Sequence, residues 1–480
     1  MRLIYFKPVT ALLASAGVLG GCGTVPKDAG FADVHRIVLD RTGQRVQWNR
    51  QSNDDASATT AVRELLGQSL DADRAVQIAL LNNRRLQATY EDLGVAQADV
   101  VQAGLLRNPV FDADLKFGTR GEGTTLEMAV VADFLDVFLI PLRRRVAEGQ
   151  FESAKLRVTA AAIDLASRTR AAFYTHVADA QTLEMRRTVT DAAAAAFDFA
   201  KRLHTAGNVS DLAFATERAA YEQAKVDFAR AEAMALDSRE RFGELLGVWG
   251  PDTQWTALPR LPELPAEEIS TADAERRAIE KSLDLAVEKQ GVTAAAQTLG
   301  IRRSFGLFPE LELGAAAERE SDGGWGVGPA VSLPIPLLDQ GQAATATAVA
   351  ELQRARQSLF ATAVEVRSAA RRARNRLLAA RAAADYYRRV ILPLRHEITQ
   401  QSQLHYNGMF IGAPQLLQAK QAEVEAGIAS IDALRDYWLA RTQFDHVLNG
   451  GNGGDSDAPA AAQNTSRRPG SAGGTRETIH

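Results

Sequence analysis

Residues 70–118 read LDADRAVQIALLNNRRLQATYEDLGVAQADVVQAGLLRNPVFDADLKFG, and residues 270–317 read STADAERRAIEKSLDLAVEKQGVTAAAQTLGIRRSFGLFPELELGAAA. The two stretches align at three pairs of residues: Ala79 with Ala278, Leu86 with Leu285, and Pro109 with Pro309. Further along, LHTAG at 203–207 aligns with LHYNG at 404–408, so the offset stays near 200 residues. An offset that persists over this length indicates one structural unit built twice.

Each unit predicts the same order of elements: a helix, two short strands, a very long helix, a tight turn and a returning helix. The expected helices cover 70–105, 141–206, 209–247, 270–303, 341–407 and 413–447. The first long helix starts at Pro141, a favoured first position, and Pro393 should kink the second. Each long helix spans roughly 100 Å, so two half-length helices placed end to end match it. These lengths predict a helical cylinder. A dimeric coiled coil is the alternative, and the strands count against it.

The strands are predicted at about 109–118, 125–138, 309–318 and 325–338. Apolar residues alternate with polar ones along them, as where Phe111 and Leu115 flank Asp112 and Asp114. A period of two with one apolar face indicates a half-buried strand, and about ten such residues are typical of a membrane barrel strand. Four strands cannot close a barrel, and an open edge in lipid leaves backbone groups unpaired. Either the sheet belongs to a soluble domain, or several chains share one barrel.

The first 21 residues look like a bacterial lipoprotein signal peptide. Arg2 and Lys7 precede an apolar run of about 11 residues, and two glycines then precede Cys22. This pattern resembles a lipobox, in which the chain is cut before the cysteine and acyl chains are added to it. We therefore expect diacylglycerol and an N-acyl chain at Cys22 and no other cofactor. An ordinary signal peptide with an incidental cysteine is the alternative.

Composition narrows the class of protein further. The 480 residues are 46% hydrophobic with a net charge of −4, which excludes wholesale disorder and argues against a nucleic-acid partner. The single cysteine excludes an intramolecular disulfide framework. After the leader, the expected domains are an extended lipidated segment at 22–67, the first unit at 68–248, a Pro-rich crossover at 249–269, the second unit at 270–449 and a disordered tail at 450–480.

Over about residues 68–448 the chain resembles the TolC-type outer-membrane efflux factors, most of all their lipoprotein branch. The resemblance rests on four motifs: Ala75-x-x-x-Ala79-x-x-x-Asn83-x-x-Leu86, QAGLL-x-NP at 102–109, VSLPIP at 331–336, and Tyr406 and Gly408 before the last helix. It implies a mainly α fold with a membrane β-barrel portion, as a homotrimer that shares a twelve-stranded barrel and a twelve-helix periplasmic tunnel. It also implies the outer membrane of a Gram-negative bacterium, a periplasmic adaptor and an inner-membrane transporter.

Acidic strand residues are the candidate lumen-lining groups: Asp112, Asp114, Glu310, Glu312 and Glu318. A trimer would present each of them three times, and acidic rings in a pore favour cations. The alternative is a solvated face that only keeps the lumen wet.

The two helical turns are the candidate periplasmic tip. Relatives often carry aspartates after the second turn, but Gln415 and Gln418 stand there in this chain, which puts an aspartate gate in doubt. Asp211 after the first turn either forms a ring at the tip or caps a helix, and capping is favoured. The turns themselves, at Gly207 and Asn208 and at Gly408 and Met409, resemble the adaptor-docking tips of the family.

Enzyme and metal motifs are weak. His396-Glu397 lacks a second histidine four residues after the first, and the glycine-rich 323–328 lacks the Lys-Ser/Thr end of a phosphate loop. His204 and His405 occupy equivalent positions, where inherited structure is favoured over metal binding. The sequence thus predicts no catalytic site.

The function predicted is the exit duct of a tripartite efflux system. A lipid-anchored periplasmic coiled-coil adaptor, the outer-membrane duct of a type I protein secretion system and a lipid-anchored enzyme are the alternatives. An adaptor would not duplicate its strands, and no enzyme site is found. Drugs, metal cations and polypeptides all stay open as cargo.

Overall fold

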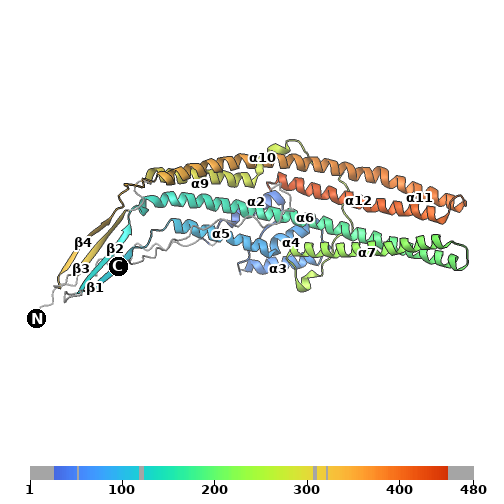
Figure 1. Ribbon diagram of the computed structural model, residues 1–480, viewed down its shortest axis with the longest axis horizontal. Coiled ribbons are helices and arrows are strands. Elements are labelled where there is room, and N and C mark those ends of the chain that lie inside the picture. The colour runs from blue at the N-terminus through green and yellow to red at the C-terminus, as the bar shows by residue number, and fades with distance from the viewer. Residues whose placement is uncertain are drawn as a thin grey trace.

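The computed structural model describes residues 26, 28–50, 53–117, 124–305, 311–319 and 323–451. The molecule is a long rod, with a four-stranded sheet at one end and two helical hairpins at the other (Figure 1). Helices account for most of its length. None of the helices in the described ranges is both long enough and apolar enough to cross a membrane.

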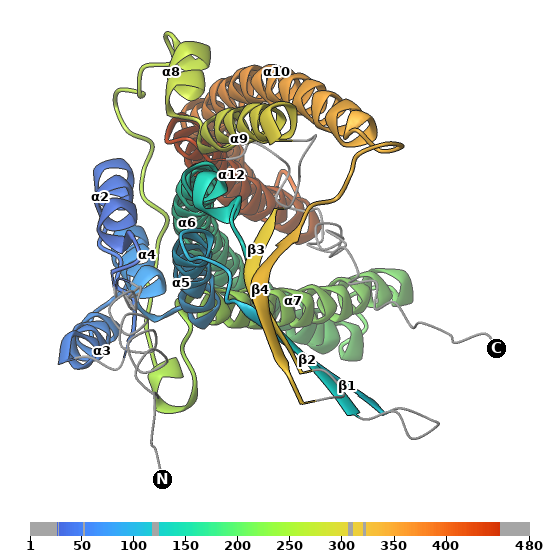
Figure 2. The same cartoon turned by 90° about the vertical axis from the view of Figure 1, so that its left-hand side faces the viewer.

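The long helix α6 (Asp136–Thr205) has 70 residues, and α5 (Arg84–Ala103) and α7 (Asp211–Leu246) lie end to end along it. In the second unit, α9 (Leu283–Phe305) and α12 (Ala413–Leu448) lie along α10 (Gln342–Tyr386) and α11 (Leu392–Asn407). Because α6 also contacts α9 and α12, the helices form one curved wall with α5 and α7 at one edge and α10 and α11 at the other (Figure 2).

The predicted helices at 70–105 and 270–303 are each broken in two. Helix α4 (Ala72–Asn82) ends before Asn83, whose side chain accepts a 3.0 Å hydrogen bond from the Leu86 amide and so starts α5. Helix α8 (Ala274–Lys281) ends in the same way before Ser282, whose hydroxyl accepts from the Leu285 amide at 3.2 Å. Asparagine and serine are both strong helix N-caps. A cap is a single side-chain contact and leaves the apolar periodicity unchanged, so the periodicity alone did not predict these breaks.

The ends of the long helices also differ from the prediction. Helix α6 begins at Asp136, so Pro141 lies inside it and not at its first position. The second long helix is interrupted, as expected near Pro393, by the π-helical segment η2 (Tyr387–Ile391). Pro393 has no amide to donate to the carbonyl four residues earlier, and a wider turn is one way in which a helix accommodates that loss.

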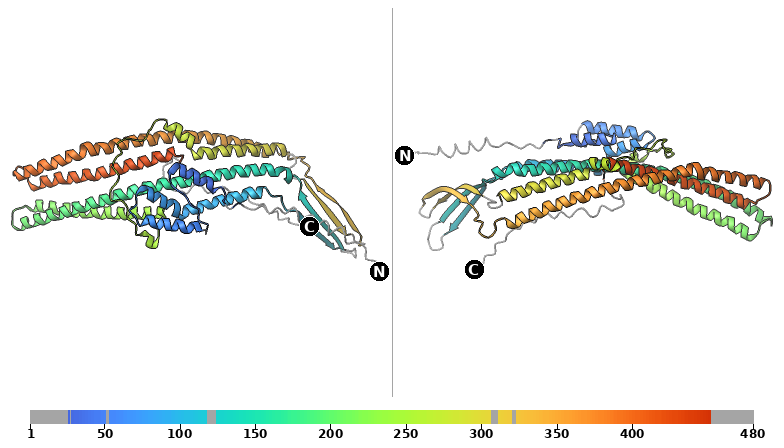
Figure 3. Two further views of the ribbon diagram at one scale, coloured as in Figure 1. Left: turned by 180° about the vertical axis from the view of Figure 1, so that it is seen from behind. Right: turned by 90° about the horizontal axis from the view of Figure 1, so that it is seen from above.

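The N-terminal segment, predicted as extended, contains two helices, α2 (Phe31–Thr42) and α3 (Asn53–Leu66). They lie on the convex side of the wall (Figures 2 and 3). Phe31 packs edge-on against the fully buried Tyr90 of α5, with ring centroids 5.1 Å apart. At the other end of α2, Arg41 donates to the carbonyls of Lys281 and Asn449, so this segment touches both units. The structure corrects the prediction because aromatic anchors on 31–48 bury against α5.

Two buried clusters hold the waist of the rod. One surrounds Tyr90, Phe173 and Phe242 of the first unit, and the other surrounds Leu377, Tyr437 and Phe444 of the second. The crossover joins them through a short 3₁₀ helix, η1 (Gly250–Thr253), and through Ala257, which pairs with Leu70. Elsewhere the wall is one helix thick, which agrees with its scarcity of aromatic residues.

The sheet has the order β1 (Val110–Phe117), β2 (Thr124–Asp133), β3 (Glu312–Arg319) and β4 (Trp325–Ser332), and every pair is antiparallel. The two predicted hairpins therefore meet at β2 and β3. Strand β4 ends at Ser332 and not at 338, because Pro334 and Pro336 have no amide for a ladder. At Gly314 a Cβ would collide with the Val130 carbonyl, so only glycine allows the two hairpins to approach this closely.

Candidate functional site

The strand register gives the sheet one polar face. Asp114 pairs with Glu127, and Glu127 pairs in turn with Glu318, so three carboxylates form one row across three strands. Asp112 lies on the same face, two residues before Asp114 in β1. At the end of the sheet nearest the helices, Glu312 pairs with Asp133. The predicted alternation therefore produces one shared acidic surface.

Four of the five predicted lumen residues lie on that polar face: Asp112, Asp114, Glu312 and Glu318. Glu310 lies outside the described residues. The prediction of lumen-lining residues from the sequence did not include Lys116. Its Nζ lies 2.7 Å from Glu127 Oε1 and 3.8 Å from Asp114 Oδ2. Its position in the same alternation as Asp112 and Asp114 was the available signal. The row is thus partly neutralised by one lysine.

The opposite face of the sheet is apolar. Leu115 pairs with Leu126, Ala113 with Met128, and Leu313 with Val331. Phe117 and Val327 are more than 70% exposed in the single chain. Apart from Arg319, which pairs with Leu126 near the loop end, this face is largely apolar and is uncovered in the protomer.

A charged cluster lies where the sheet meets the helices. Asp136, the first residue of α6, is fully buried, and its carboxylate lies 3.1 Å from Arg143 Nη2 and 3.5 Å from Arg107 Nε. Arg107 also lies 3.7 Å from Asp133 at the end of β2. Because buried charges are costly unless paired, these contacts fix the direction in which the strands leave the wall.

At the opposite end of the molecule, the turn between α6 and α7 contains Gly207 and Asn208. Gly207 has φ of 74°, a left-handed conformation that glycine adopts at low cost. The helix cap is Ser210, whose hydroxyl accepts from the Ala213 amide at 3.3 Å, so the predicted capping role of Asp211 is wrong. Asp211 instead lies 2.7 Å from Nε2 of His204, which stacks on Phe214.

The turn between α11 and α12 differs in character. Gly408 and Met409 bring Phe410 beside His405, and the exposed fractions of Met409 and Phe410 are 93% and 81%. Gln415 and Gln418 lie exposed on the first turns of α12. In the described part of the chain no three His, Cys, Asp or Glu side chains are grouped so as to hold a metal ion.

The waist holds a further charged site, at Glu268 of the crossover. Its carboxylate accepts hydrogen bonds from Arg441 at 2.7 Å and from Arg381, Tyr437 and the Ile269 amide at 2.9 Å. Burial raises the pKa of Glu268, but the hydrogen bonds from Ile269, Tyr437 and Arg381 outweigh it and hold that pKa below its usual value. This site fastens the crossover to α10 and α12.

Comparison with solved structures gives a consistent result. The chain is similar to a membrane protein from Pseudomonas aeruginosa, with a TM-score of 0.67 and 17% identity over 82% of this chain and 91% of the other. It is similar to the transmembrane channel CusC, with a TM-score of 0.64 and 16% identity over 82% and 92% of the two chains. The Campylobacter jejuni outer-membrane channel CmeC aligns over 85% of this chain and 91% of its own, with 15% identity and a TM-score of 0.59.

No protein-family model matches the sequence, and no curated protein matches it either. The similarity therefore lies in the three-dimensional arrangement. The alignments cover about nine-tenths of each of these three neighbours. The chain has the fold of the TolC-type outer-membrane efflux channels.

Proposed function

We propose that this protein is the outer-membrane exit duct of a tripartite efflux system and conducts its cargo passively. The observation that carries the proposal is the sheet, which has one acidic face and one apolar face and is continuous with a wall of helices about 100 Å long. The apolar face suits lipid and the acidic face suits a water-filled lumen.

Closure of the sheet requires further copies of the chain. In the described protomer β1 and β4 are the edge strands, and an open strand edge in lipid leaves backbone groups unsatisfied. Three copies would supply twelve strands, with β1 of one chain beside β4 of the next. The same closure would bring the α5 and α7 edge of the wall against the α10 and α11 edge of a neighbour. A homotrimer would thus form the barrel and the tunnel together.

The remaining parts fit the two ends of such a duct. Acyl chains on Cys22 would anchor the chain in the outer membrane, and the tunnel would project into the periplasm. The turns at Gly207 and Asn208 and at Gly408 and Met409 would face a periplasmic adaptor and, beyond it, an inner-membrane transporter. Met409 and Phe410 offer that adaptor an exposed apolar contact. Gln415 and Gln418 would line a tip without an acidic ring.

The duct is tested by membrane fractionation, gel migration without boiling and conductance in planar bilayers. We expect the full-length protein in the outer membrane, migrating as a trimer that dissociates on boiling and forming discrete channels. A soluble, inner-membrane or purely monomeric protein would rule out the proposal. The anchor is tested by Cys22→Ala, which should abolish labelling by radioactive palmitate. Labelling that persists in this variant would refute lipidation at Cys22.

A further inference from the structure

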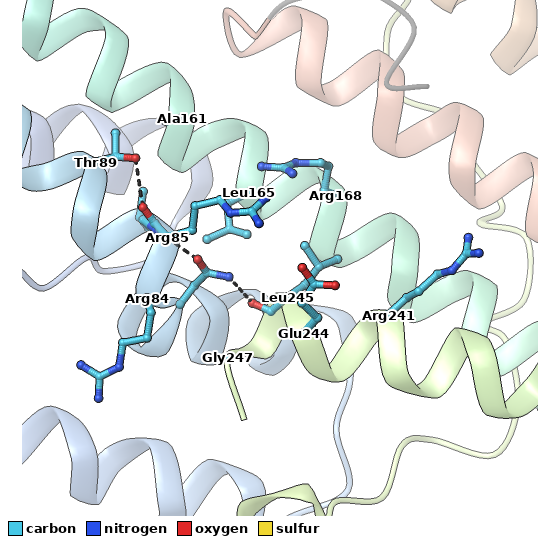
Figure 4. A pocket seen from close by; sticks show the side chains of 12 residues that line it. Arg84, Arg85, Thr89, Ala161, Leu165, Arg168, Arg241, Glu244, Leu245 and Gly247 are labelled. Atoms are coloured by element: carbon cyan, nitrogen blue, oxygen red, sulfur yellow. Dashed lines mark hydrogen bonds between the residues drawn. The ribbon is translucent and has the colours of Figure 1, made fainter. Parts of the chain in front are cut away.

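A cavity of about 560 Å³ lies where α5 begins, where α7 ends and where both meet the side of α6 (Figure 4). Four of its lining residues are arginines, and one is an acid: Arg84, Arg85, Arg168, Arg241 and Glu244. Arg85 and Arg168 extend over the middle of the cavity, whereas Arg84 and Arg241 point outward at its two ends (Figure 4). We call this site the arginine pocket.

The arginine pocket opens on the concave side of the wall. The N-terminal helix α2 covers the convex side of α6, where Lys155 Nζ lies 2.8 Å from Asp33. At 100° per residue, Ala161 and Arg168 are separated from Lys155 by roughly 120–140° around α6, on the face turned away from α2, and Leu165 is separated from it by roughly 80°. On α5, Arg85 is separated by about 140° from Tyr90, which packs against Phe31 at the start of α2. Both helices therefore present the pocket to the inside of the curve.

The positive charge in the pocket is poorly neutralised. Arg84 and Arg85 have no ion pair within the described residues, and the first turn of α5 contains no acidic residue. Cations at a helix N-terminus are unfavourable, because the helix dipole is already positive there. Among the residues that the structure describes, Arg168 pairs with Asp164 and Arg241 with Asp237, each on its own helix, and these side chains are all more than 40% exposed. Exposed pairs of this kind exchange readily for another anion.

The floor of the pocket is apolar. Leu86 and Leu165 line it and are 3% and 4% exposed, and Ala161 and Leu245 complete the surface. Guanidinium groups around an apolar floor suit a ligand with an apolar body and one planar anionic group. Arginine binds carboxylates and phosphates through paired N–H donors, which gives both strength and orientation.

The second unit shows that this charge is particular to the first. Asp284 stands where Arg85 stands in the first unit, and Glu288 stands where Thr89 stands. Burial, together with the nearby Glu288 and Glu365, raises the pKa of Asp284. The same place in the repeat is therefore acidic in one unit and basic in the other, so the arginines are not simply inherited with the wall.

We propose that the arginine pocket binds an organic anion, a solute with an apolar body and a carboxylate, sulfonate or phosphate group. This inference rests on the proposed duct, since the concave side of the wall is the tunnel interior only in the closed trimer. The pocket then forms three binding stations at the waist of the tunnel, and it biases the duct toward anionic cargo.

Calorimetry on the full-length protein in detergent tests the proposal, with 2-naphthoate as the probe and neutral 2-naphthamide as the matched ligand. We expect naphthoate to bind at least tenfold more tightly than naphthamide, and its affinity to fall as salt rises. The variant Arg85→Gln/Arg168→Gln should lose at least tenfold in naphthoate affinity. Arg157→Gln, also on α6 but lining the adjacent cavity, should change it by less than twofold.

Equal affinity for naphthoate and naphthamide in the unaltered protein would overturn the anion site without any variant. Unchanged naphthoate affinity in the Arg85→Gln/Arg168→Gln variant would overturn it as well. Bilayer conductance of the same preparation separates this inference from the duct. Channels without selective naphthoate binding would refute the pocket alone, and selective binding without channels would support the pocket and refute the duct.

Discussion

Arg186 of α6 and Glu425 of α12 join the two units by a forked ion pair, with Nη1 2.5 Å from Oε1 and Nη2 3.3 Å from Oε2. Arg186 lies 19 residues before the end of α6, and Glu425 lies 12 residues after the start of α12, so both belong to the part of each helix that leads to the tip turns. The two partners are 239 residues apart in the chain, and the pair adds a charged contact to the packing of α6 against α12. Its strength bears on whether the hairpins move as one body.

Replacing Arg186 should loosen the tip. Glu425 is about half exposed, so we expect Arg186→Gln to lower the free energy of unfolding by no more than about 1 kcal/mol. It should nevertheless raise the mean single-channel conductance, because the second hairpin loses one of its contacts with α6. Arg202→Gln is the matched control, since Arg202 pairs with Asp198 of its own helix. Equal conductance in the two variants would show that the inter-unit pair does not restrain the tip.

Lys116 should reduce the cation selectivity of the lumen. Its ammonium neutralises Glu127 and Asp114 in the acidic row, so Lys116→Gln should raise the K⁺/Cl⁻ permeability ratio, by roughly twofold. Asp112→Asn should lower the ratio. The reversal potential in a KCl gradient measures both effects. Arg319→Gln, on the opposite face of the sheet, is the control and should leave the ratio unchanged. If neither lumen variant shifts the potential, the acidic face serves only to keep the lumen wet.

Glu268→Gln should destabilise the waist. The change leaves Arg381 and Arg441 without their shared carboxylate. Because the Glu268 side chain is 13% exposed and the two arginines are 20–26% exposed, we expect a cost below the about 3–5 kcal/mol of a fully buried pair. Thermal unfolding in detergent should show a fall in Tm of several degrees. Glu267→Gln, the exposed neighbour, should leave Tm within error. Similar Tm values for the two variants would mean that the Glu268 site does not fasten the crossover.

Acid should weaken the first unit through His176. Burial, with a smaller effect from Arg239, lowers the pKa of His176 to about 4, so the ring is neutral in the folded chain. The unfolded chain binds a proton near pH 6.5, so stability is full above that pH and is lost as pH falls toward 4. The loss amounts to about 3 kcal/mol. His176→Leu should remove this part of the pH dependence of Tm, and identical Tm profiles for the two proteins would contradict the assignment.

The architecture could be predicted because its determinants are periodic. The alternation through Phe111, Asp112 and Leu115 gave both faces of the sheet, and the offset between Leu86 and Leu285 gave the duplication. Asn83 and Ser282 were missed as helix breaks because capping is a single side-chain contact that leaves the apolar period intact. Sequence patterns report repeated features more reliably than single contacts.

The charged contacts could not be predicted from the sequence, because each joins residues that are far apart in the chain. The carboxylate of Glu268 meets Arg381 and Arg441, more than a hundred residues away, and nothing in the local pattern brings them together. Asp211 was predicted as a cap from its position alone, but the Ala213 amide donates to the hydroxyl of Ser210, which is the N-cap. The arginine pocket likewise forms from three helices, and no segment read by itself indicates it.

The π-helical segment before Pro393 lies in a part of the second unit that is one residue longer than its counterpart in the first. The offset between the units is 199 residues at Leu86 and Leu285, 200 at Pro109 and Pro309, and 201 at Leu203 and Leu404. The offset therefore grows by one residue between 309 and 404, and a π turn is one way in which an α-helix absorbs an extra residue. The wider turn lets the second long helix continue past Pro393 to the turn at 404–408, which aligns with the turn at 203–207 of the first unit.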